Sequence, residues 1–226
     1  MDWLTLFGLA FLSYFIGAFP TGVVLGKLFK GVDLRQHGSG KTGATNSLRT
    51  LGWQISLLVF LIDMGKGAVS VWLAQLLFAP EYQPWAVLVT AVLCMLGHDY
   101  SIFIGFSGGR GAASGLGELL AVSPLAVLFI TLFGLPALLI TRYVSLASIL
   151  GSALAPVGIL FASYITGLDW RYLFFAAAAG GMIIIKHADN IQRLLNGTER
   201  KLGQKAGTSN SKPAPSNSKE KQSATK

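Results

Sequence analysis

The feature that most constrains this chain is a series of apolar runs, most of them long enough to cross a membrane. In its 226 residues these runs lie at about 3–29, 52–78, 85–105, 111–140, 143–166 and 170–186. A helix needs ~20 apolar residues to span the hydrocarbon core of a bilayer. Because 52% of the residues are hydrophobic and only 12% are charged, the chain is too apolar for a soluble domain. We therefore expect an all-α integral membrane protein, built as a polytopic helix bundle.

The number of crossings depends on the run at 111–140, which is too long for one straight span. Ser123-Pro124 interrupts it, and proline removes a helical hydrogen bond. Two short segments there give about seven transmembrane helices, some of them short. Basic residues outnumber acidic ones in the loop after the first run, so that loop is expected in the cytoplasm and the amino terminus outside. Only an odd number of crossings then brings the basic carboxyl-terminal end into the cytoplasm.

The carboxyl-terminal end differs in composition from the rest of the chain. Residues 201–226 are rich in Ser, Lys, Pro, Asn and Gly, with six lysines and one glutamate. Such a segment cannot bury enough apolar surface to fold, so we predict a disordered basic cytoplasmic tail after a membrane-embedded domain at 1–200. Its charge suits anionic lipid headgroups. No RNA-binding motif accompanies the lysines, and we expect no nucleic acid partner.

A glycine-rich loop between the first two apolar runs, Gly38 to Asn46, carries groups suited to a phosphate. It offers flexible backbone N–H groups, hydroxyls, an amide and a cation. A dinucleotide fingerprint does not fit, since no strand precedes the loop, and a P-loop requires glycine where this chain has Arg35. A merely flexible turn is the alternative. The residues predicted to bind a substrate phosphate here are Ser39, Gly40, Thr45, Asn46 and Arg49.

A second glycine-rich segment follows Gly97-His98, between residues 105 and 111. Four glycines within seven residues flank one arginine, so backbone and guanidinium can approach an anion closely. The alternative is a hinge whose arginine extends to the membrane interface. The residues expected to assist phosphate binding are Gly108, Gly109, Arg110 and Gly111.

A third polar region stands at the end of the last span. His187 and Asn190 are three residues apart, so they can share one helical face towards a substrate. Ser145 and Ser148 have the same spacing at the start of another span, where they would otherwise be ordinary helix-packing residues. With seven crossings all three polar regions lie on the cytoplasmic side, as a single active site requires.

Two charged residues, Asp63 and Lys66, lie inside the second apolar run, where unpaired charges are costly. Their spacing of three allows them to pair. The pair either supports a functional site or is a structural clip.

The sequence gives no sign of a metal or disulfide site. The three histidines lie far apart, and the single cysteine, Cys94, is inside an apolar run. We expect neither a metal nor another cofactor.

These motifs, in this order, resemble the bacterial acyl-phosphate:glycerol-3-phosphate acyltransferases of the PlsY type. The resemblance covers nearly the whole chain except the tail, and the matching segments are 13–17 with 20–22, 38–46 with 48–52, 63–67, 97–98, 108–111, 143–148 and 187–199. It implies a seven-helix enzyme of the bacterial inner membrane with cytoplasmic glycine-rich loops. Such an enzyme moves a fatty acyl group from acyl phosphate, not acyl-CoA, to the 1-hydroxyl of glycerol 3-phosphate. The products are lysophosphatidic acid and phosphate, in the first step of phospholipid synthesis.

The resemblance also suggests roles for the polar residues. The expected catalytic residues are His187, Asn190, Ser148, Ser145 and Arg110. The expected supporting residues are Asp63, Lys66 and His98. His187 is the best candidate for a general base on its ordinary pKa, and a substrate phosphate is the alternative proton acceptor.

Three residues depart from the family pattern: Lys41 stands where asparagine is common, Arg110 replaces lysine, and Ala188 replaces an arginine. Arginine for lysine keeps the charge and changes the geometry of phosphate contact. A dyad with aspartate five residues after histidine, used by another acyltransferase class, is absent. The alternative from a different class is a transporter of a phosphorylated solute with Asp63 and Lys66 on its pathway.

Overall fold

The computed structural model describes residues 2–204, so all but the first four residues of the predicted tail lie outside the described range. Within that range the elements are helices, which confirms the predicted all-α class. In chain order they are α1 (Trp3–Ala18), α2 (Thr21–Lys30), η1 (Leu34–Gln36), α3 (Ala44–Thr50), α4 (Trp53–Leu77), α5 (Gln83–Asp99), η2 (Ile102–Ile104), α6 (Ala112–Val122), α7 (Pro124–Thr141), α8 (Val144–Thr166), α9 (Tyr172–Lys186) and α10 (Ala188–Leu195).

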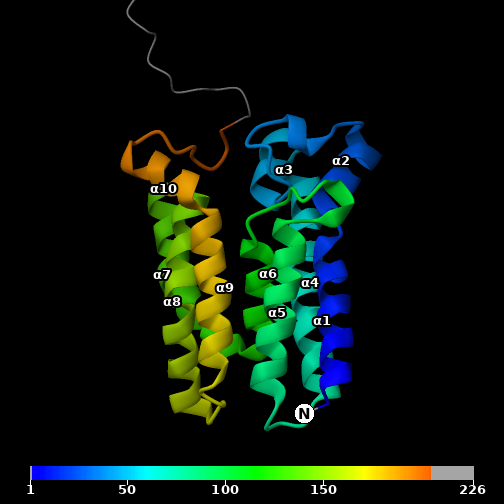
Figure 1. Cartoon of the computed structure of the whole chain (residues 1–226). Helices are drawn as coiled ribbons and strands as arrows, with labels where there is room; N and C mark the ends of the chain where they lie inside the picture. Colours follow the sequence, from blue (N-terminus) through cyan, green and yellow to red (C-terminus); the bar gives the residue numbers. More distant parts are fainter. Residues whose placement is uncertain (1, 205–226) are drawn as a thin grey trace, which may run out of the picture.

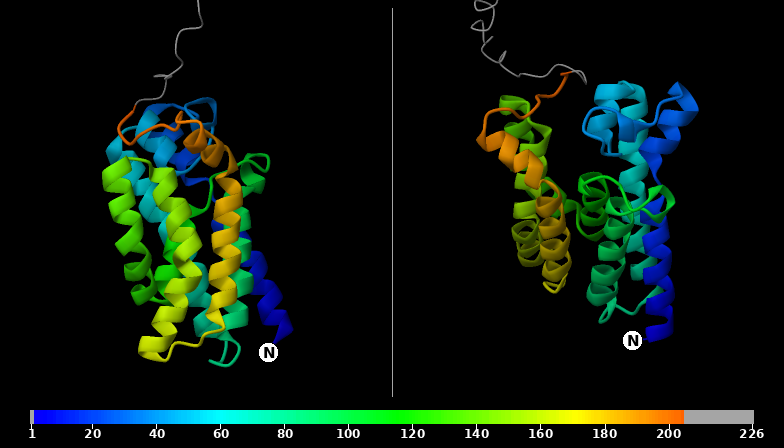
Figure 2. Two further views of the ribbon diagram at one scale, coloured as in Figure 1. Left: turned by 90° about the vertical axis from the view of Figure 1, so that its left-hand side faces the viewer. Right: turned by 45° about the horizontal axis from the view of Figure 1, so that its top comes forward.

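The long axis of the bundle is followed by helices α1, α4, α5, α6, α7, α8 and α9 (Figure 1). Helices α7, α8 and α9 form one group, and α1, α4, α5 and α6 form the other (Figures 1 and 2). Helix α1 packs on α5, α4 on α6, and α8 between α7 and α9, while α5 meets α9 across the two groups. Within the described residues, α1 with α2, α4, α7 and α8 are long and apolar enough to span a membrane, and α6 and α9 are shorter apolar helices.

The break predicted within the run at 111–140 is confirmed. Helix α6 ends at Val122 and α7 begins at Pro124. The Ser123 side chain accepts a hydrogen bond of 3.2 Å from the backbone N–H of Ala126, so it caps α7. Proline suits the first turn of a helix, where its missing N–H would have no intrahelical partner. A single residue therefore joins the two helix groups at this point.

The first apolar run is a single candidate span, Trp3–Lys30, as expected, but it is broken into two helices. Helix α1 ends at Ala18, and α2 begins at Thr21 after the Phe19-Pro20 pair. The ring of Pro20 cannot continue a helix and disfavours helical geometry in the residue before it. The chain therefore turns at this point, and α2 lies at the same end of the bundle as α3 (Figure 1).

The three polar regions predicted to share one side do so. The loop with η1 and α3, the segment between α5 and α6, and α10 lie towards one end of the bundle, opposite the amino terminus (Figure 1). Chain segments separated by more than 100 residues are thus brought to one place, as the seven-crossing arrangement requires.

Glycines allow the closest helix contacts in the bundle. A Cβ at Gly17 of α1 would overlap the backbone carbonyl of Cys94 in α5. A Cβ at Gly117 of α6 would likewise overlap the backbone carbonyl of Met64 in α4. Small residues at such contacts let backbones approach closely, which is how helices in a membrane gain packing energy. The backbone of α1 is therefore in direct contact with that of α5, and the backbone of α6 with that of α4.

Replacing these glycines should destabilise the bundle in a position-dependent way. We expect Gly17→Ala to lower the free energy of unfolding by about 1–3 kcal/mol, because the added methyl forces α1 and α5 apart. Gly8→Ala is the matched control, since Gly8 is exposed on the same helix and has nothing within 4 Å of an added Cβ. Thermal unfolding in one detergent compares them. Equal melting temperatures would contradict the close α1–α5 contact.

Candidate active site

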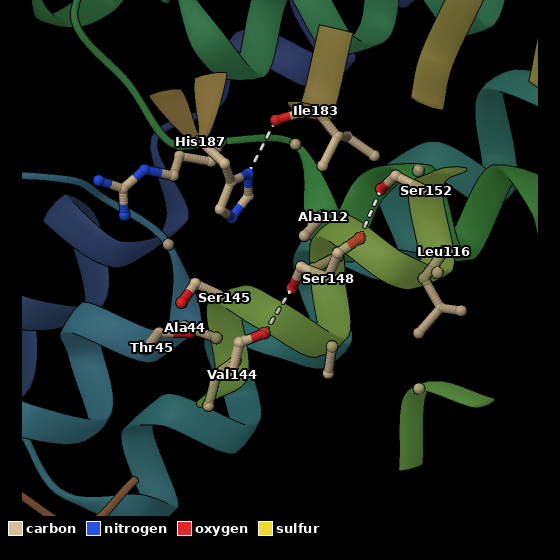
Figure 3. A pocket seen from close by; sticks show the side chains of 18 of the residues that line it. Ala44, Thr45, Ala112, Leu116, Val144, Ser145, Ser148, Ser152, Ile183 and His187 are labelled. Carbon is tan, nitrogen blue, oxygen red and sulfur yellow. Dashed lines mark hydrogen bonds between the residues drawn. The ribbon is translucent and has the colours of Figure 1, made fainter. Parts of the chain in front are cut away.

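A cavity of about 550 Å³ lies between the first loop, α6, α7, α8 and α9. Its polar lining residues include Ser39, Lys41, Thr45, Arg49, Arg110 and His187. Its apolar lining residues include Leu116, Leu119, Ile130, Leu135, Leu138, Phe175 and Ile183. In Figure 3, Thr45, Ser145 and His187 lie towards one side of the pocket and Leu116 towards the other. A cavity with one polar side and one apolar side is suited to an amphiphile.

Asn46 organises the first loop with its side-chain amide. Its Oδ1 accepts a hydrogen bond of 3.0 Å from the backbone N–H of Ser39. Its Nδ2 donates to the carbonyls of Leu34, His37 and Lys41 at 3.3, 3.0 and 2.8 Å. An amide engaged in this way has little capacity left for a ligand. The geometry therefore favours loop support over the direct phosphate contact expected from the sequence.

Gly40 also shapes the loop. It has a φ of +69°, in the left-handed region that favours glycine, and its N–H donates to the His37 carbonyl at 3.0 Å. It does not line the cavity, whereas Ser39, Thr45 and Arg49 do. The loop therefore presents hydroxyls and a cation to the cavity and uses its central glycine to turn.

The second glycine-rich segment divides in the same way. Arg110 and Gly111 line the cavity. Gly109 donates its N–H to the His98 carbonyl at 3.1 Å, and a Cβ there would overlap the His98 ring. A Cβ at Gly108 would overlap the same carbonyl. These two glycines thus pack on the end of α5 and fix the position of the segment.

His187 stands at the junction of α9 and α10, and the orientation of its ring is fixed. Its Nδ1 lies 2.8 Å from the Ile183 carbonyl, and because a carbonyl only accepts, Nδ1 carries the hydrogen. In the neutral ring Nε2 is then the atom with a free lone pair. Burial lowers the pKa of His187 below its ordinary value of 6.5, and the nearby Arg110 acts in the same direction. The ring is therefore neutral near pH 7.

Glu199 joins the third region to the serines of α8, a connection that the sequence does not predict. This buried carboxylate accepts hydrogen bonds from the Ser145 hydroxyl at 3.0 Å and from Asn190 Nδ2 at 2.8 Å. Its other oxygen accepts from Arg193 Nε at 2.7 Å. Glu199 follows α10 in an irregular segment, so no helical spacing links it to its partners. The only sign of Glu199 in the sequence is its place at the end of the matching segment 187–199.

The serines of α8 line the cavity with different partners. Ser145 faces Glu199, as above, while the Ser148 hydroxyl donates to the Val144 carbonyl one turn back at 3.1 Å. Figure 3 shows both serines and His187 around the same space. Asn190 also lines the cavity, and its buried Oδ1 has no hydrogen-bond partner among residues 2–204. The expected grouping of His187, Asn190, Ser145 and Ser148 is present.

Arg110 is held at the cavity by α9 and α10. Its Nε donates to the Lys186 carbonyl at 3.1 Å, and one terminal nitrogen donates to Asp189 Oδ2 at 2.7 Å. Partial burial opposes ionisation of Asp189, but Arg110 holds the pKa of this carboxyl below its usual value. The guanidinium is thus oriented before any ligand arrives.

Asp63 and Lys66 form the ion pair predicted from their spacing, with Lys66 Nζ 2.8 Å from Asp63 Oδ1. Both side chains are buried. Lys66 Nζ also donates to the carbonyls of Gly17 and Phe19 at 3.1 and 2.9 Å. These carbonyls lie at the end of α1, where the break removes their intrahelical partners. Lys66 therefore supplies hydrogen bonds to backbone carbonyls at the break in the first span.

Asp63 makes two further contacts that connect this pair to the site. The Thr21 hydroxyl at the start of α2 donates to Asp63 Oδ1 at 2.8 Å. His98 Nδ1 lies 3.8 Å from the same oxygen. Asp63 and His98 line the cavity, whereas Lys66 does not. The group spans α1, α2, α4 and α5, which fits a structural clip at the base of the polar side.

Comparison with known proteins decides the family. The family model described as glycerol-3-phosphate acyltransferase matches residues 7–197. The chain belongs to this family. A glycerol-3-phosphate acyltransferase of Rippkaea orientalis is 40% identical over 205 residues, which cover 87% of this chain and 93% of the relative. The glycerol-3-phosphate acyltransferase 2 of Moorella thermoacetica is 40% identical over 194 residues, or 86% and 96% of the two chains.

Solved structures give the same result. The crystal structure of PlsY, an integral membrane glycerol 3-phosphate acyltransferase, in its glycerol 3-phosphate form matches with a TM-score of 0.79 at 41% identity. The match covers 88% of this chain and 96% of that one. The lysophosphatidic acid form matches with a TM-score of 0.77 at 40% identity, over 88% and 95% of the two chains. The protein is therefore an integral membrane member of an acyltransferase family, and the transporter alternative is set aside.

Removing the lysine of the buried pair should destabilise the whole enzyme. We expect Lys66→Met to cost about 3–5 kcal/mol of unfolding free energy, because it leaves Asp63 buried without its cation. The double variant Lys66→Met, Asp63→Asn removes both charges and should recover part of this loss. Melting temperatures in detergent measure the effect. A Lys66→Met variant as stable as the unmodified chain would contradict a structural role for the Asp63–Lys66 pair.

Proposed function

We propose that this chain transfers a fatty acyl group from acyl phosphate to the 1-hydroxyl of glycerol 3-phosphate, releasing phosphate and lysophosphatidic acid. The observation that carries the proposal is the two-sided cavity, whose polar side holds three cations: Lys41, Arg49 and Arg110. Both substrates bring a phosphate, and one also brings a fatty chain. Membership in the glycerol-3-phosphate acyltransferase family supports the same reaction.

The division of the lining residues suggests where each phosphate binds. Ser39, Thr45 and Arg49 offer hydroxyls and a cation from the first loop, on a backbone that Asn46 and Gly40 keep in shape. We assign one phosphate to this loop. Arg110, on the opposite segment, then serves the second anion, which we assign to the phosphate of glycerol 3-phosphate. An acyl phosphate is already activated, so positioning two anions and stabilising developing charge supply most of what catalysis requires.

We assign the proton of the glycerol hydroxyl to His187. The oxygen at position 1 forms a bond to the acyl carbon, the bond between that carbon and the phosphate oxygen breaks, and the phosphate leaves. The proton passes to Nε2, the ring atom left free by the bond between Nδ1 and Ile183. Ser145, Ser148 and Asn190 are placed to orient the glycerol hydroxyls. A phosphate of the substrate is the alternative proton acceptor.

We also propose that the enzyme lies in the bacterial inner membrane with its active site in the cytoplasm and its amino terminus outside. The first loop carries Arg35, Lys41 and Arg49, and it lies at the end of the bundle that holds the cavity (Figure 1). The positive-inside rule assigns such an end to the cytoplasm. All the residues that line the cavity fall within 1–200, which we propose as the catalytic unit.

The acyl donor is tested by offering two donors separately to purified protein. With labelled glycerol 3-phosphate, we expect lysophosphatidic acid from palmitoyl phosphate and none from palmitoyl-CoA. An acyl-CoA-dependent acyltransferase that works in the same detergent is the positive control for the second donor. Product from the CoA ester alone would overturn the proposed donor, and no product from either would overturn the proposed reaction.

The role of His187 predicts a pH profile. A general base acts in its neutral form, and burial lowers this pKa, so kcat at saturating substrate should be full at pH 7–8 and fall only below 6.5. His187→Gln should remove the part of that acid limb that the imidazole causes, leaving the part due to phosphate, and should lower kcat by about 10²–10⁴-fold, the usual contribution of general base catalysis. Phosphate groups titrate near pH ~6 in both proteins, so the variant also serves as the control. Near-normal turnover by the glutamine variant would mean that a substrate phosphate, and not His187, accepts the proton.

A further inference from the structure

Arg110 differs from the other two cations of the cavity in one respect. Arg110 forms an ion pair with Asp189, whose Oδ2 lies 2.7 Å from a terminal nitrogen of the guanidinium. Within residues 2–204, neither Lys41 nor Arg49 forms an ion pair with a carboxylate. Arg49 instead donates to the backbone carbonyl of Arg200 at 3.3 Å. The anion position of one phosphate-facing cation is therefore filled by the protein itself.

The two members of this pair are buried unequally. The Arg110 side chain is 15% exposed, and that of Asp189 is 54% exposed. A largely buried guanidinium needs an anion beside it, because its loss of hydration is otherwise uncompensated. A half-exposed carboxylate can return to water at small cost. The carboxylate is thus the partner that can leave.

Asp189 also has a second partner when it leaves. Arg193 lies one turn along α10, with its NH1 nitrogen 3.5 Å from Asp189 Oδ2. That arginine is held in place by its bond to Glu199 at 2.7 Å. Released from Arg110, the carboxylate therefore stays at the start of α10, where a negative charge is also favoured by the helix dipole.

We propose that Asp189 is a specificity residue that acts through Arg110, by occupying its anion position until a phosphate displaces the carboxylate. This inference rests on the proposed role of Arg110 in phosphate binding. A dianionic phosphate gains more from the guanidinium than the single charge of Asp189 does, so the exchange is favourable. A singly charged carboxylate ligand only replaces one carboxylate by another and gains nothing.

Two consequences follow for binding. The competition weakens the affinity for glycerol 3-phosphate and for inorganic phosphate alike, which also favours release of the phosphate product. It penalises a monoanionic analogue such as glycerate more strongly, because that ligand has no surplus charge with which to displace Asp189. Asp189 therefore selects for ligand charge without touching the reacting atoms.

Asp189→Asn tests the proposal in the purified full-length chain. Titration calorimetry with inorganic phosphate and with glycerol 3-phosphate should give about fivefold tighter binding, the size expected for removal of one partly exposed ion pair. Glycerate should inhibit the variant at concentrations that leave the unmodified enzyme active. The KM for glycerol 3-phosphate should fall while kcat changes by less than about twofold, since no interaction specific to the transition state is lost.

Matched variants separate this effect from charge or folding. Asp169→Asn removes the same charge from another aspartate–arginine pair, outside the cavity lining, and should leave all affinities unchanged. Asp189→Glu should retain the binding constants of the unmodified enzyme. If the asparagine variant does not fold, Asp189→Ser replaces it.

Unchanged or weaker phosphate binding by a folded Asp189 variant would overturn the inference. Failure of the proposed reaction is a different result, because it would be a lack of turnover by the unmodified enzyme. The calorimetric comparison does not depend on turnover.

Discussion

The fold depends on one buried cation, the ammonium group of Lys66, at the point where the first span breaks. Pro20 ends α1 inside the apolar bundle, and the last carbonyls of that helix lose their intrahelical donors. A buried carbonyl without a hydrogen-bond donor is costly, so the break requires a donor from elsewhere in the bundle. Lys66 supplies it, and Asp63 makes the lysine tolerable by pairing with it. Since Asp63 also holds Thr21 and lies beside His98, the same interaction supports the base of the active site.

The site then follows from how three polar segments are fixed above that base. Asn46 closes the first loop on itself, Gly108 and Gly109 pack the second segment against α5, and Glu199 ties Asn190 to α8. In each segment a strongly polar residue or a glycine makes the contacts that fix its backbone. The remaining hydroxyls, cations and the imidazole are left to face the cavity, at the boundary between an apolar bundle and water.

The bundle, the break at Ser123-Pro124 and the grouping of the polar regions could be predicted because they depend on local signals: run length, proline and charge bias. The Asp63–Lys66 pair could be predicted from helical spacing, but its contacts with the end of α1 could not, since they join residues 47 and 49 positions apart. The sequence also could not separate ligand-facing from loop-supporting residues. Asn46 and Gly108 have suitable chemistry for binding a phosphate, and only the three-dimensional contacts show that their polar groups or space are already used. Glu199 was missed for the same reason.

The glycine contacts between helices also bear on how this protein tolerates change. Where side chains meet, a substitution is absorbed by a different rotamer, and its effect is graded. Where Gly17 meets the backbone of Cys94, there is no side chain to move, so the helices themselves must shift. Since α5 carries His98 at its end and also packs on α9, which leads into His187, such a shift is transmitted to the residues that we propose as catalytic. Sequence drift at these positions is therefore limited by the geometry of a distant reaction as well as by local fit.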